Sequence, residues 1–235
     1  MQKRCFFVTS TGTDIGKTFI STAIVQGGIA TNHSCYAIKP IISGFDQNDV
    51  INTDTGRLIT ALGLSHDIET INSLSPWRYS APISPDIAAS REGDKIDFGD
   101  LIEFCQQAIG RVQDILLVEG VGGAMVPLDD HHTVTDWISV LDIPVLLVAG
   151  TYMGTISHIL TALSTFESRH IRVGAIILNE SEISPVSPKE LEISLKHFIK
   201  DIPIISFPRV QTTISHQLLT SIQQEFFKII MGLKI

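Results

Sequence analysis

The chain has 235 residues, a formal net charge of −8 and 44% hydrophobic residues. This length accommodates one sizeable α/β domain with a complete core, and the hydrophobic content excludes a disordered chain. The acidic balance, without any cluster of Lys and Arg, argues against nucleic-acid binding. We therefore expect a single folded domain over residues 1–235.

The apolar segments are too short for a membrane span or a secretory signal. The longest apolar run, residues 143–149, falls far below the roughly 20 residues that cross a bilayer. Cys5, Cys35 and Cys105 are widely spaced and odd in number, which fits neither a disulfide framework nor a zinc site. These features predict a cytoplasmic protein without a membrane partner.

Short β-branched runs alternate with helical patterns along the chain. The expected strands are residues 5–9, 34–39, 115–119, 145–149, 173–179 and 202–206. The expected helices are residues 17–30, 55–62, 98–110, 134–141, 155–167 and 188–200. Asp97 and Ser187 are expected N-caps, and Thr133 with Asp136 fits a capping box. Residues 63–95, which contain three prolines, are expected to form a long connection.

This alternation predicts an α/β fold, a doubly wound and mostly parallel sheet with helices on both faces. In such sheets ligands bind beyond the carboxyl ends of the strands. Polar residues at strand ends are therefore the first candidates for a functional site.

Residues 8–19, VTSTGTDIGKTF, contain a candidate phosphate-binding loop. The usual pattern G-x-x-x-x-G-K-[ST] would place a glycine where this chain has Thr11. The segment nevertheless follows an expected strand and opens an expected helix, whose N-terminal N–H groups can hold phosphate oxygens. Lys17 would face the β- and γ-phosphates, and the Thr18 hydroxyl could bind Mg²⁺. The alternative, a chance Gly-Lys-Thr on a surface turn, does not explain this context.

Two charged residues stand at other strand ends. Lys39 precedes Pro40 and would project toward the same crevice as Lys17, although a solvated lysine is the alternative. Glu119 closes the apolar strand in LLVEGVGG, a place where an acidic residue can hold a metal. A tight turn would explain the glycines that follow, but not the carboxylate.

Two polar residues have competing interpretations. Asp54 lies at an expected helix start, where it could cap the helix or serve as a metal ligand near Thr18 and Glu119. Asn179 ends an expected strand, and its carboxamide could pair with the N6/N7 edge of adenine. An ordinary turn asparagine is the alternative.

Taken together and in order, the motifs resemble those of dethiobiotin synthetases, ATP-dependent cyclising enzymes of biotin synthesis. The segments that carry the resemblance are VTSTGTDIGKT, KPIISG, NTD, SPDIAASREG, VEGVGG, TDW and MGTISH. This family has five residues between the first glycine of the loop and Gly-Lys-Thr, so position 10 should be glycine. This chain has Ser10 there, and Ser157 where the family usually has asparagine.

The resemblance implies specific roles. It implies that Lys39 and Lys17 are catalytic, that Thr18, Asp54 and Glu119 hold Mg²⁺, and that Ser43 and Gly122 contact the substrate. The residues implied for ATP are Asp14, Ile15, Gly16, Lys17, Thr18, Phe19, Asp54, Glu119, Gly120, Val121, Gly122, Asn179, Glu180, Pro208, Arg209 and Val210.

The implied reaction joins CO₂ to 7,8-diaminononanoate (diaminopelargonate) and closes the ring of dethiobiotin, with ATP converted to ADP and phosphate. The implied assembly is a homodimer whose substrate site is completed by the partner's segment 153–158. The main alternative is a regulatory, partitioning-type P-loop ATPase. Such proteins normally carry a second lysine near the start of the loop, and residues 9–14 contain none. Cobyrinate-type synthetases with a glutaminase domain are usually larger than this chain.

Overall fold

The computed structural model describes residues 3–210 and 214–234. Its centre is a six-stranded, fully parallel sheet in which every strand expected from the sequence is found within two residues of its predicted ends. Such a sheet, covered on both faces, requires the near-continuous apolar strands seen in the sequence. In spatial order the strands are β2 (Cys35–Ile38), β5 (Ile115–Glu119), β1 (Arg4–Ser10), β6 (Val145–Ala149), β7 (Val173–Asn179) and β8 (Ile204–Phe207).

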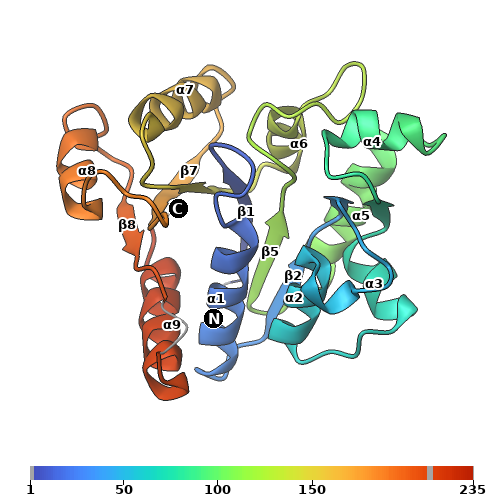
Figure 1. Ribbon diagram of the computed structural model, residues 1–235, viewed down its shortest axis with the longest axis horizontal. Helices are drawn as coiled ribbons and strands as arrows, with labels where there is room; N and C mark the ends of the chain where they lie inside the picture. Colours follow the sequence, from blue (N-terminus) through green and yellow to red (C-terminus); the bar gives the residue numbers. More distant parts are fainter. Residues whose placement is uncertain (1–2, 211–213, 235) are drawn as a thin grey trace.

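Helices pack on both faces of this sheet, and the chain therefore has the predicted doubly wound α/β fold (Figure 1). One face is covered by α1 (Lys17–Ile29), α2 (Asp54–Leu62), α3 (Ile68–Leu74) and α9 (His216–Met231). The other is covered by α5 (Phe98–Arg111), α6 (Val134–Leu141), α7 (Thr155–Ser168) and α8 (Pro188–Leu195). None of the helices within the described ranges is long and apolar enough to cross a bilayer. The expectation of one domain over the whole chain stays a prediction.

The region 63–95 differs from the expected connection. It contains α3, β4 (Trp77–Tyr79) and α4 (Pro85–Arg91), and β4 pairs in parallel with β3 (Ile41–Ser43) in a separate small sheet. A short 3₁₀ helix, η1 (Val50–Asn52), precedes α2. Elements this short show too few repeats for a period to be recognised in the sequence, so the prediction of a long connection missed α3, β4 and α4.

Helix ends follow local capping chemistry. The side chains of Asp97 and Ser187 accept hydrogen bonds from the backbone N–H groups of Asp100 and Glu190, which confirms both predicted N-caps. The capping box of α6 at Thr133 is also present. Helix α8 ends at Leu195, earlier than the predicted residue 200.

Two glycines let α9 lie directly against α1 (Figure 1). A Cβ atom on Gly27 would lie 2.1 Å from the backbone oxygen of Gln223, and one on Gly28 would lie 2.2 Å from the Cys35 sulfur. Because side chains of any size are excluded at these positions, the two helices approach closely. The helix that follows the phosphate-binding loop is thus held by the last helix of the structure.

This packing predicts opposite effects for two Gly→Ala substitutions. Gly27→Ala should lower the free energy of unfolding by about 1–3 kcal/mol, because the new methyl group meets backbone that must shift. Gly110→Ala, on α5, meets nothing within 4 Å and should raise the stability by about 0.5–1 kcal/mol. Urea unfolding of both variants checks this pair, and equal effects of the two substitutions would contradict it.

Candidate active site

Three neighbouring strand ends supply the main polar residues of the site. The order β2-β5-β1 sets Lys39, Glu119 and Ser10 at adjacent positions on one edge of the sheet. All strands are parallel, so their carboxyl ends meet at this edge.

The loop between β1 and α1 has the geometry of an anion cradle. Asp14 and Gly16 have positive φ angles of 57° and 96°. Gly16 is the N-cap of α1, which has no side-chain cap and no acidic residue in its first turn. The free N–H groups and the positive end of the helix dipole therefore remain available for an anion.

Asn179 fixes this loop from the end of β7. Its Nδ2 donates a hydrogen bond of 2.9 Å to the backbone oxygen of Ile15. A Cβ atom on Gly16 would lie 2.2 Å from the same nitrogen, so only glycine fits there. Asn179 therefore contacts the loop itself.

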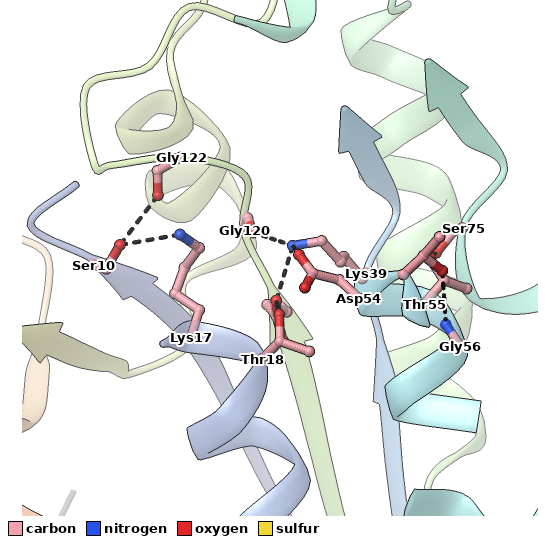
Figure 2. A network of polar contacts seen from close by, with 12 residues as sticks. Ser10, Lys17, Thr18, Lys39, Asp54, Thr55, Gly56, Ser75, Gly120 and Gly122 are labelled. Atoms are coloured by element: carbon pink, nitrogen blue, oxygen red, sulfur yellow. Dashed lines mark hydrogen bonds and ion pairs between the residues drawn. The ribbon is translucent and has the colours of Figure 1, made fainter. Parts of the chain in front are cut away.

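A buried lysine gathers the acidic residues (Figure 2). The Lys39 side chain is 3% exposed, and its Nζ lies 2.8 Å from Glu119 Oε1 and 3.3 Å from Asp54 Oδ2. It also donates to the Gly120 carbonyl at 3.2 Å, and the Thr18 hydroxyl donates to the same Glu119 oxygen. The ammonium group thus joins Asp54 to residues 119–120, and Thr18 joins the cluster through Glu119.

Asp54 is free to join this cluster because another residue caps its helix. The Thr53 hydroxyl accepts the hydrogen bond from the Gly56 N–H. The capping interpretation of Asp54 is therefore not what the structure shows: the residue opens α2 and its carboxylate faces Lys39.

The Lys39–Asp54 ion pair holds both of its partners in the charged form. Burial alone would lower the pKa of Lys39, but Glu119 and Asp54 outweigh it, and the net shift is upward. For Asp54, burial favours the neutral acid, yet the adjacent Lys39 ammonium lowers its pKa below the usual range. The site is accordingly a fixed cluster of charges at neutral pH.

Lys17 lies in a different environment. Its side chain is buried, and its Nζ contacts the Ser10 hydroxyl at 3.1 Å and the Gly12 carbonyl at 3.5 Å. Burial, and next the positive charge of Lys39, lower the pKa of Lys17 to about 8. A bound anion would restore the charged form.

A cavity of about 520 Å³ opens between these groups. Both lysines line it, and the Ser43 hydroxyl oxygen is buried without a partner in the described part of the chain. The residues implied by the resemblance that line it are Asp14, Gly16, Lys17, Thr18, Phe19, Lys39, Ser43, Asp54, Val121 and Gly122.

Other implied residues lie outside the lining. Glu180, Pro208, Arg209 and Val210 stand beyond the ends of β7 and β8, where the Arg209 N–H donates to the Glu180 carboxylate at 3.0 Å. Phe19 lines the cavity and packs edge-on against Phe207, 5.4 Å between ring centroids. Four implied residues lie behind the lining: Glu119 and Gly120 accept from Lys39, and Asn179 donates to Ile15.

Sequence reasoning missed several lining residues. Arg57 lies one turn after Asp54 on α2, so helical spacing from Asp54 was the signal that could have found it. Residues 82–84, between β4 and α4, and Pro85, the first residue of α4, line the cavity as well. They overlap the SPDIAASREG segment, to which no role was assigned.

The oxygen donors fit a magnesium ion. Glu119 is fully buried, and its Oε2 has no hydrogen-bond partner within residues 3–210 and 214–234. Its Oε1 accepts from the Thr18 hydroxyl and from Lys39, which also pairs with the Asp54 carboxylate. The described residues hold no cluster of three or more His, Cys, Asp or Glu side chains that could bind a metal unaided. Mg²⁺ typically takes one or two carboxylates and completes its shell with water and phosphate oxygens.

A parallel sheet, a phosphate cradle on β1 and a buried acid on the adjacent strand define a P-loop nucleotide-binding protein. Solved structures share this fold. The MinC:MinD complex of Aquifex aeolicus has a TM-score of 0.58 at 14% identity, covering 99% of this chain and 97% of that one. A ParA family ATPase of Chlorobium tepidum has a TM-score of 0.54 at 17% identity, and the match covers 98% of this chain and 93% of that one. A family model described as an AAA domain matches residues 4–224.

Curated relatives identify the family to which this P-loop protein belongs. The ATP-dependent dethiobiotin synthetase BioD of Acidiphilium cryptum is 43% identical over 84% of this chain and 89% of its own length. The enzyme of the same name from Caulobacter vibrioides is 42% identical over 88% of this chain and 93% of its own length. The chain belongs to the dethiobiotin synthetase family, which confirms the resemblance seen in the motifs.

The lowered pKa of Lys17 predicts pH-dependent nucleotide binding. Above about pH 8 the apo protein loses the Lys17 charge, so binding a triphosphate must take up a proton and affinity should fall by up to about tenfold per pH unit. Calorimetry in buffers of different ionisation enthalpy should detect about one proton taken up at about pH 9 and little at about pH 6.5. Lys17→Arg, which stays charged, should flatten this dependence. If nucleotide affinity in the parent protein did not change between about pH 6.5 and about pH 9, the lowered pKa of Lys17 would be contradicted.

Proposed function

We propose that this protein is an ATP-dependent dethiobiotin synthetase. It joins CO₂ to 7,8-diaminononanoate and closes a cyclic urea, forming C–N bonds while ATP becomes ADP and phosphate. The observation that carries the proposal is the 43% identity to a synthetase of this name over most of both chains. The cavity is lined by Lys17, Lys39, Thr18 and Asp54, with Glu119 bonded to Lys39 behind the lining, and this set of groups suits the chemistry.

The reaction has three steps. One substrate amine adds to CO₂ and loses a proton, giving a carbamate. A carbamate oxygen attacks the γ-phosphorus of ATP and ADP leaves, which gives a carbamic-phosphoric anhydride. The second amine then attacks the anhydride carbonyl and expels phosphate, closing the ring.

The protein must bring two anions together, and we assign that work to Lys17 and Lys39. Positioning the carbamate and the γ-phosphate in line can lower the activation barrier by roughly 7–11 kcal/mol. Positive groups fixed in a cavity stabilise the charge that develops between them. Mg²⁺, held by Thr18, Asp54 and Glu119, would supply further neutralisation of the phosphate oxygens when bound.

We assign the remaining residues by position. Asp14, Ile15, Gly16 and Phe19 surround the phosphates, and Ser43 with Gly122 contacts the diamine; the unpartnered Ser43 hydroxyl supports this. Gly120 and Val121 approach the nucleotide from the β5 side. Asn179, Glu180, Pro208, Arg209 and Val210 form the base pocket, for which their common location at the ends of β7 and β8 is the support.

We also propose that the protein acts in the cytoplasm as a homodimer with the substrate site at the interface. An apolar hollow of about 940 Å³ lies at the start of α7, next to Met153, which is 82% exposed. A second copy would cover this surface, and Ser157 lies on it.

The alternative, a partitioning-type ATPase, rests on the shared fold alone. Solved structures of that class are only 12–17% identical to this chain. A diamine requirement separates the two functions, because a partitioning ATPase hydrolyses ATP without it.

Phosphate release should therefore require the diamine. Incubation with ATP, Mg²⁺ and bicarbonate should release phosphate only when 7,8-diaminononanoate is added, and mass spectrometry should detect dethiobiotin in equal amount. The matched control is a monoamine of the same chain length, which can form a carbamate but cannot close the ring. Equal phosphate release without the diamine would favour the partitioning ATPase.

Lys39→Gln should separate turnover from binding. Loss of a fixed positive group at the reacting phosphate should lower kcat about 10²–10³-fold. Nucleotide affinity should fall only about threefold, because the loop and Lys17 hold most of the triphosphate. Steady-state kinetics and equilibrium titration measure the two effects, and circular dichroism verifies folding, since Glu119 loses its partner. Full activity in this variant would remove Lys39 from its assigned role.

A further inference from the structure

The cavity is lined by a third basic residue besides the two lysines. Lys39 is ion-paired with Glu119 and Asp54, and Lys17 is buried against the loop after β1. Arg57 also lines the cavity, but its guanidinium forms no ion pair with any residue in the part of the chain that the structure describes. Because Arg57 is exposed, its charge is available to a ligand at the mouth of the cavity.

Helix α2 holds Arg57 in this position. Arg57 follows Asp54 by three residues, so the two side chains share one face of the helix. The opposite side is fixed in the core, where Leu58 and Ile59 are fully buried. The ion pair between Asp54 and Lys39 fixes the start of the same helix. The guanidinium therefore extends from a rigid support.

The position of α2 in the fold indicates which part of a nucleotide Arg57 would meet. Helix α2 packs against α1 on the side of β2 and β5 (Figure 1). Strands β7 and β8, at whose ends we place the base, lie on the other side of α1. A triphosphate that crosses the start of α1 from the base pocket therefore directs its last phosphate toward α2. Asp54, which we assign to Mg²⁺, stands on that same helix.

The charges of the cavity make a further cation necessary for an anionic ligand. Its other charged groups are two ammonium groups and three carboxylates, namely Lys17, Lys39, Asp14, Asp54 and, behind the lining, Glu119. Arg57 brings the positive charges to the number of the negative ones. A guanidinium is also the group best suited to phosphate, because two of its parallel N–H bonds match two phosphate oxygens.

We propose that Arg57 binds the terminal phosphate oxygens of ATP and thereby distinguishes ATP from ADP. This rests on the proposed function, because that function places a triphosphate over the loop before α1. None of the roles implied by the sequence motifs falls on Arg57. Once the γ-phosphoryl group has been transferred and released as phosphate, Arg57 has no further contact with the nucleotide, and ADP is held less tightly than ATP.

The test compares two nucleotides by equilibrium titration. A non-hydrolysable ATP analogue and ADP, each with Mg²⁺, are titrated by calorimetry into the parent protein and into Arg57→Gln. The substitution should weaken binding of the ATP analogue about ten- to a hundredfold, which is the usual range for a lost hydrogen bond between charged groups. The affinity for ADP should stay within about twofold. Arg57→Lys keeps the charge but loses the planar fork, so it should recover only part of the affinity for the analogue.

Arg111→Gln is the matched control. Arg111 is an exposed arginine at the end of α5, on the other face of the sheet, so this variant loses the same charge away from the cavity. Both of its affinities should stay within about twofold of the parent, because salt screens distant surface charges. Circular dichroism verifies that the variants are folded.

Two results of the Arg57→Gln titration would overturn the inference: unchanged binding of the ATP analogue, or equal weakening of the analogue and ADP. Failure of the proposed function would look different. A parent protein that binds the analogue more tightly than ADP, but forms no dethiobiotin from the diamine, would overturn that function and leave the role of Arg57 standing.

Discussion

The site depends on one buried ammonium group held between two carboxylates. Lys39 is tied by its side chain to Glu119 and Asp54, and its backbone N–H donates to the Leu74 carbonyl at 3.1 Å. Removing one partner of such a buried pair typically costs about 3–5 kcal/mol, because a charge is left without compensation. The ends of β2 and β5 and the start of α2 are therefore fixed relative to one another by the same charges that face the cavity.

The strand order explains why a few residues at strand ends are enough to form the site. Because β5 lies between β2 and β1, its terminal carboxylate stands between the lysine that follows β2 and the loop that follows β1. The strands beneath are buried on both faces. A close-packed core of this kind resists deformation. Precise positions at the edge of the sheet are thus a consequence of packing far from the cavity.

The sequence predicted what local patterns determine. Continuous apolar runs marked the strands, and the strand-end rule pointed to Lys39, Glu119 and the loop before Lys17. Contacts between residues that lie far apart in the sequence could not be predicted from local patterns. The hydrogen bond from Asn179 to Ile15 spans 164 positions. Whether Asp54 capped α2 depended on Thr53 taking that role, and the approach of Arg57 to the cavity depended on the packing of α2. Residues 63–95 hold elements too short to show a period.

The pairing of α1 with α9 imposes an order on biosynthesis. Residues 17–29 leave the ribosome early, whereas residues 216–231, which cover them, are translated much later. At about 5–20 residues per second the delay is on the order of ten seconds or more. Until residues 216–231 have been made, the face of residues 17–29 that packs against them lacks this partner.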